Sequence, residues 1–176
     1  ALITSQDEED RGTSSYYLLR GLAPGSTGSG RGRTQITRLS PHEMSRESIG
    51  AAELIVIDHP GKLSDEQIRL LASLLRRGHG VLYVAAEAID ATNLKLLSDA
   101  AGTAVRLPVE FAPPAAGRPR RDLFLTDIRQ AEPPFAVFGE SLTSLISPLR
   151  FSGGLVSRPV EGALAEDVLA TFNDQS

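Results

Sequence analysis

The chain has 176 residues, of which 41% are hydrophobic and 23% charged, the ordinary range for one globular domain. The formal charge of −4 argues against a general nucleic-acid-binding protein, and no apolar run reaches the roughly 18 residues that a membrane-spanning helix needs. The absence of cysteine excludes disulfides, zinc–thiolate sites and thiol nucleophiles. Because the three histidines are scattered, we expect neither a bound metal nor a cofactor.

The first half of the chain alternates predicted strands and helices. In chain order we expect a strand at 1–5, a helix at 14–22, an edge strand at 33–39 and a short helix within 40–49. Ser14 or Ser15 can cap the helix at 14–22. The Gly/Ser-rich segment 25–32 lacks the Gly-Lys-Ser/Thr ending of a phosphate-binding loop, so we interpret it as a flexible connection.

A buried strand at 54–57 precedes the clearest helix of the sequence. Ser64 and Gln67 form a capping box, and Ile68, Leu71, Ala72 and Leu75 recur at the spacing of one buried helical face. A second buried strand follows at 81–85. Asp90 can cap a further helix, and residues 105–107 are predicted to form one more strand.

The C-terminal part is richer in proline and less regular. Strands are predicted at 123–128, 149–156 and 167–172, with a short helix starting at 133–135. No crossover helix separates the last two strands, so they can pair antiparallel. The chain opens on one strand and stops just after another. We therefore expect residues 1–176 to form a single domain cut from a longer polypeptide.

The middle of the chain carries a family resemblance. The strand at 54–57, the loop Asp58-His59-Pro60, the helix start at 63–67 and the glycine-rich turn Arg76-Arg77-Gly78-His79-Gly80 resemble the core of the class I glutamine amidotransferase-like superfamily. Residues 16–24 and 167–174 are similar to the amidotransferase-like domains of large bacterial membrane proteins with Bat-type N-terminal and von Willebrand factor A regions. The resemblance implies a membrane-anchored protein with this domain on the extracytoplasmic, periplasmic side.

The alternation of strands and helices predicts an α/β fold with a mostly parallel sheet. The resemblance implies more narrowly a flavodoxin-like three-layer sandwich, with antiparallel strands confined to the C-terminal end.

The sequence departs from the family at the nucleophile. Active members place a cysteine at the sharp turn after the strand that here spans 81–85, but this turn reads Ala86-Glu87-Ala88. No histidine follows His79 to act as the family's base. We therefore predict a non-catalytic interaction or assembly module without enzymatic activity. Its expected partners are other proteins or other domains of the same polypeptide, and no direct insertion into a membrane is expected.

Carboxylates at the strand ends support an alternative function. Asp7, Asp58 and Glu87 each follow a predicted strand, and His59 lies beside Asp58. Ligands of parallel sheets bind at this edge, so the four residues are candidates for a small-ligand or metal-dependent sensor or enzyme. The competing interpretation is that acidic residues favour turns and helix starts.

A degenerate phosphoreceiver is the remote alternative. Residues 55–61 resemble the phosphoacceptor strand of a response-regulator receiver, which would make Asp58 the acceptor and residues 6–10 its acidic pocket. The hydroxyl side chain and the lysine that such a receiver needs on the later strands have no counterpart.

Overall fold

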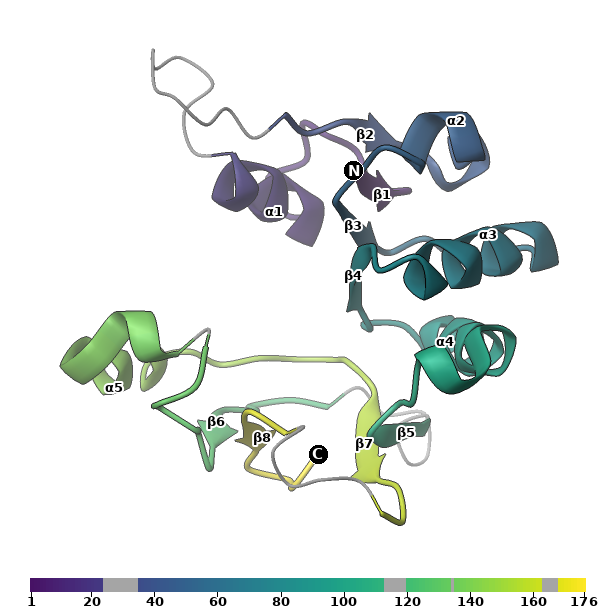
Figure 1. Ribbon diagram of the computed structural model, residues 1–176. Coiled ribbons are helices and arrows are strands. Elements are labelled where there is room, and N and C mark those ends of the chain that lie inside the picture. The colour runs from purple at the N-terminus through teal and green to yellow at the C-terminus, as the bar shows by residue number, and fades with distance from the viewer. Residues whose placement is uncertain (24–34, 113–119, 134, 163–167) are drawn as a thin grey trace. The chain divides into compact units, whose positions relative to one another are not determined.

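The computed structural model describes residues 1–23, 35–112, 120–133, 135–162 and 168–176 (Figure 1). The predicted flexible segment 25–32 lies outside these residues. The chain divides into two compact units, Ala1–Arg106 and Leu107–Ser176. We describe each unit by itself, and the expectation of a single domain over 1–176 stays a prediction.

The first unit contains a four-stranded parallel sheet with the strand order β2-β1-β3-β4. Its strands are β1 (Leu2–Thr4), β2 (Arg38–Leu39), β3 (Leu54–Asp58) and β4 (Gly80–Val84). Its helices are α1 (Ser14–Leu22), α2 (Arg46–Ile49), α3 (Asp65–Arg76) and α4 (Ala88–Ala101), with 3-10 turns η1 (Pro41–Glu43) and η2 (Gly102–Ala104).

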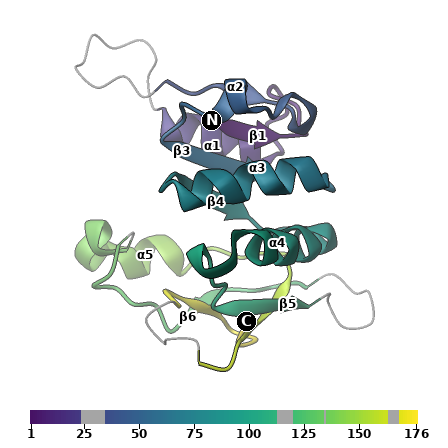
Figure 2. The same cartoon turned by 45° about the vertical axis from the view of Figure 1, so that its right-hand side comes forward.

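Helices cover both faces of this sheet. Figure 1 shows α1 on one side and α3 and α4 on the other, and Figure 2 shows α3 and α4 side by side. The layers and the strand order confirm the predicted α/β, flavodoxin-like arrangement.

Helix α3 and the strands beneath it form the main core of the first unit. The capping box is present: the Gln67 amide donates to Ser64 Oγ at 3.3 Å, and Gln67 Oε1 accepts from the Ser64 amide at 2.8 Å. The buried face of α3 comprises Ile68, Leu71, Ala72 and Leu74, and it packs with Ile3, Ile55 and Ile57 of the sheet. The sequence predicted Leu75 on the buried face, but Leu74 is the residue that is fully buried. Leu75 is partly buried and packs against the core.

Four predicted elements of the first unit differ from the structure. The edge strand predicted at 33–39 is described only at Arg38–Leu39, and residues 40–49 form η1 and α2 instead of one helix. Helix α4 begins at Ala88, so Asp90 acts from inside the first turn and not as the N-cap. No strand forms at 105–107, because η2 turns the chain there and the next strand begins only after Pro108.

The second unit is built from short antiparallel pairs. β5 (Val109–Ala112) pairs with β7 (Val156–Pro159), and β6 (Leu125–Thr126) pairs with β8 (Thr171–Phe172). The short helix predicted to start at 133–135 is the 3-10 turn η4 (Ala136–Ser141), whose N-cap is Phe135. It leads into the helix α5 (Leu142–Ile146), which was not predicted. The predicted antiparallel character of the C-terminal end is confirmed, although β7 and β8 pair with β5 and β6 and not with each other.

Backbone conformation explains why two predicted strands are shorter than expected. Asp127 has a left-handed φ of 44°, which ends the strand that begins at Leu125. Gly153 and Gly154 have φ values of 82° and 75°, so the strand expected from residue 149 begins only at Val156.

Arg120 ties the C-terminal residues to the second unit. Its guanidinium donates to both carboxylate oxygens of Asp174, at 2.9 and 2.7 Å, and to the Leu155 carbonyl at 2.6 Å. Such a bidentate pair fixes orientation as well as distance.

Among the helices that the structure describes, none is long and apolar enough to cross a membrane.

Candidate functional site

The candidate site lies where β1 and β3 end. Thr4 pairs with Asp58 in the register of the two strands, so their following loops start at the same edge of the sheet. The strand order reverses between β1 and β3, and this is the position where parallel sheets of this order bind ligands.

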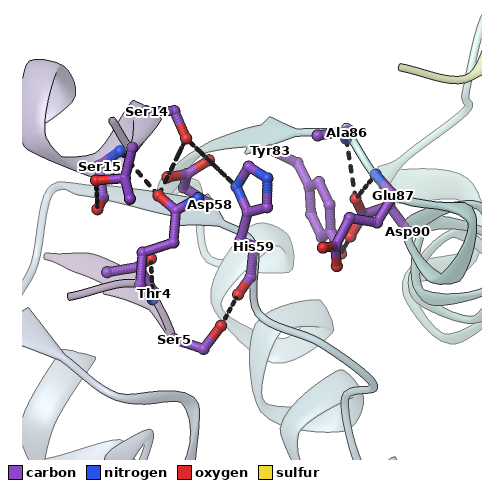
Figure 3. Close-up of polar contacts among 12 residues, drawn as sticks. Thr4, Ser5, Ser14, Ser15, Asp58, His59, Tyr83, Ala86, Glu87 and Asp90 are labelled. Atoms are coloured by element: carbon purple, nitrogen blue, oxygen red, sulfur yellow. Dashed lines mark hydrogen bonds and ion pairs between the residues drawn. The ribbon is translucent and has the colours of Figure 1, made fainter. Parts of the chain in front are cut away.

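The carboxylate of Asp58 is the centre of this site. Its side chain has no exposed surface. Ser14 Oγ lies 2.9 and 2.8 Å from the two carboxylate oxygens and donates to this pair, while His59 Nδ1 lies 2.8 Å from Oδ1 (Figure 3). A buried carboxylate needs such donors in place of water. The three side chains therefore form a network that satisfies Asp58 from within the fold.

His59 is held in an unusual backbone conformation. Its φ is 47°, in the left-handed region that costs a residue with a β-carbon about 1–3 kcal/mol. The backbone N–H of Ser5 donates to the His59 carbonyl at 3.3 Å, and the Ser5 hydroxyl donates to the same oxygen at 2.5 Å. The end of β1 thus fixes the loop that carries His59.

Gln6 connects the same loop to helix α1. Its side-chain oxygen accepts from the Ser15 amide at 3.1 Å and lies 3.2 Å from Ser14 Oγ. Arg38 donates through its guanidinium to the Gln6 carbonyl. The sequence predicts Ser14 or Ser15 as the helix cap, and it places Gln6 only in the acidic pocket 6–10 of the receiver alternative. The N-cap is Thr13, and Ser14 turns to Asp58, which lies 44 residues away in the sequence.

The predicted carboxylates do not gather into one cluster. Asp58 and His59 are in contact, whereas Asp7 accepts from the Glu9 amide at 2.9 Å inside its own loop. Glu87 is exposed at the start of α4. Among the residues that the structure describes, no group of three His, Cys, Asp or Glu side chains is placed to hold a metal ion.

A second polar network lies at the turn after β4. The fully buried Asp90 carboxylate accepts from the Tyr83 hydroxyl at 2.8 Å and from the amides of Ala86 and Glu87 at 2.9 and 2.8 Å. Figure 3 shows these contacts as a group separate from those of Asp58. Both backbone amides of the turn after β4 are thus bonded to the Asp90 side chain inside the fold.

Asn93 extends this network to the loop after β3. It accepts from the Leu63 amide at 3.1 Å and donates to the Gly61 carbonyl at 2.7 Å and to the Tyr83 hydroxyl at 2.9 Å. Burial raises the pKa of Tyr83 well above its usual value, and the acceptor Asp90 adds to this while the bond from Asn93 opposes it. The sequence signal that could have found this network is the polar Asn93 directly before the apolar Leu94, both of which are buried in α4.

The first network is not a serine–histidine–aspartate catalytic triad. In a triad, the serine contacts one imidazole nitrogen and the aspartate contacts the other. Here Ser14 Oγ and Asp58 Oδ1 both face Nδ1 of His59, at 3.3 and 2.8 Å. The imidazole therefore cannot relay a proton from Ser14, and Ser14 is not activated as a nucleophile.

Comparisons with known proteins add no family assignment. No family model matches the chain, and neither the curated proteins nor the solved structures give a significant match to it.

Proposed function

We propose that this chain is a non-catalytic, amidotransferase-like interaction or assembly module of a larger membrane-anchored bacterial protein. The observation that carries the proposal is the turn after β4. It offers no thiol or hydroxyl at Ala86 or Glu87, and the amides of both residues donate to Asp90.

Acyl-transfer chemistry needs free N–H donors as well as a nucleophile. An oxyanion hole works because its donors are unoccupied until negative charge develops on the substrate. The Asp90 carboxylate already occupies the two amides of this turn and would repel a second anion at the same place. The geometry therefore supports loss of the site as a whole and not the loss of one residue.

Exposed apolar side chains support a role in binding other proteins. In the second unit, Val137 is 81% exposed and Leu145 is 53% exposed, and Phe138 and Leu149 are also exposed. Large apolar side chains that cluster on one segment are typical of contact surfaces. We assign residues 136–149 as the contact segment of the module.

The absence of catalysis is tested by measuring ammonia release from glutamine. We expect no release above the buffer blank from the purified chain or from the variant A86C, because Asp90 occupies the donors beside the introduced thiol. Glutamine-dependent turnover by the unmodified chain would refute the proposal.

The contact role is tested by hydrogen exchange in the full polypeptide. Amides of residues 136–149 should exchange more slowly there than in the isolated chain, and the double variant V137D/L145D should abolish this difference. The variant E140Q changes an exposed polar residue of the same segment and serves as the control. Equal exchange in both contexts would contradict an interaction with the other domains.

The complete gene product tests the architecture, which requires membrane helices and a von Willebrand factor A region.

A further inference from the structure

We propose that His59 is a phosphoryl acceptor: its Nε2 atom is held ready to react with an activated phosphate at the edge of the sheet. The proposal rests on the placement of His59 between the buried Asp58 carboxylate and solvent. It is independent of the proposed interaction function.

The hydrogen-bond network fixes the tautomer of the imidazole. A carboxylate only accepts hydrogen bonds, and Asp58 Oδ1 lies 2.8 Å from Nδ1. Nδ1 therefore carries the hydrogen, which leaves the lone pair of the neutral ring on Nε2. The Ser14 hydroxyl donates to the same carboxylate and keeps it in place beside the ring.

The Nε2 side of the ring is open. The His59 side chain is 23% exposed, and Figure 3 shows the second ring nitrogen on the side away from Ser14 without a partner. His59 Nε2 makes no hydrogen bond within the described part of the chain. A buried nitrogen without a partner would be an orphan, and among the described residues Arg38 Nε is the one such atom. Nε2 is therefore not buried. Asp58, by contrast, has no exposed surface to offer to a phosphodonor.

The strained backbone supports a functional role for His59. A proline disfavours helical conformations of the residue before it. His59 precedes Pro60 and has a φ of 47°. Two hydrogen bonds from Ser5 hold this conformation. Strain that the surrounding structure maintains is concentrated at functional positions.

The reaction balances with an acyl phosphate as the phosphodonor. The Nε2 lone pair attacks phosphorus, the N–P bond forms, and the P–O bond to the acyl group breaks. The carboxylate of the donor leaves with the bonding electron pair. The proton stays on Nδ1, and the Asp58 carboxylate balances the positive charge that the ring acquires.

The experiment uses the purified chain with acetyl phosphate as the probe and maps the phosphorylated residue by mass spectrometry. We expect labelling at His59, with the alkali-stable, acid-labile behaviour of a phosphoramidate bond. His42 and His79 are internal controls in the same molecule, and the variants H42Q and H79Q should retain the label. The variant H59Q should lose it.

The variant D58N separates charge from structure, because asparagine can still accept from Nδ1. It should slow labelling about tenfold or more, because the ring loses the carboxylate that balances its developing positive charge. Absence of label, equal label on the three histidines, an alkali-labile label on Asp58 or an unchanged rate in D58N would each overturn the proposal. Mapping the unmodified chain decides the matter even where a variant fails to fold.

Discussion

Replacing Asp90 with alanine should destabilise the first unit by about 3 kcal/mol. The change removes the acceptor of three hydrogen bonds at 2.8 to 2.9 Å. The Tyr83 hydroxyl is half-buried, and leaving it without its acceptor costs about 1–3 kcal/mol. The amides of Ala86 and Glu87 lie at a turn that water can reach, so each loses about 0.5–1 kcal/mol. Removing a buried charge offsets part of this sum, which places the expected value in the middle of the range.

Urea unfolding followed by tyrosine fluorescence measures this change. The three tyrosines Tyr16, Tyr17 and Tyr83 all lie in the first unit, so the signal reports on that unit alone. The free energy of unfolding should fall with an unchanged dependence on urea. In a Y83F background, D90A should cost about 1 kcal/mol less, because the Tyr83 hydroxyl that bonds to Asp90 is already absent. A loss below about 1 kcal/mol for D90A would refute our account of the network.

Three further predictions concern the cap of α3, the half-buried Tyr83 hydroxyl and the ion pair of Arg120 with Asp174. The variant S64A should lower the stability of the first unit by about 1 kcal/mol in urea unfolding because it removes the acceptor for the Gln67 amide, whereas S64D should retain most of it. Tyrosine in an unfolded chain ionises near pH 10, and burial holds the pKa of Tyr83 higher. The stability that Tyr83 contributes is therefore complete below pH 10 and is lost as the pH rises above it. The free energy of unfolding, relative to that of Y83F, should fall by about 1.4 kcal/mol per pH unit in this range. Parallel pH curves for the two proteins would contradict this. The variant R120A should destabilise the second unit by about 1–3 kcal/mol in unfolding followed by circular dichroism. The variant R120K should recover little of this loss, because lysine cannot make the bidentate pair with Asp174. Full recovery by R120K would show that charge alone suffices.

Elements whose stability is local could be predicted from the sequence. The apolar run at Leu54–Ile57 and the capping box of α3 lie within a few residues of one another, and both are present in the structure. The strands of the second unit could not be located in this way. Two of them have only two residues each, and their partners lie far along the chain, as β6 and β8 do. Pairing of this kind depends on tertiary contacts, which a local pattern does not encode.

The candidate site divides in the same manner. The sequence by itself determined that the turn Ala86-Glu87-Ala88 carries neither a thiol nor a hydroxyl, because the identity of a residue needs no folding to establish. It also placed Asp58 and His59 together, since they are neighbours in the chain. Only the tertiary structure decided their roles. Folding brings Ser14 to within 2.9 Å of both oxygens of Asp58 and buries that carboxylate, so the reactive candidate moves from the aspartate to the open nitrogen of His59.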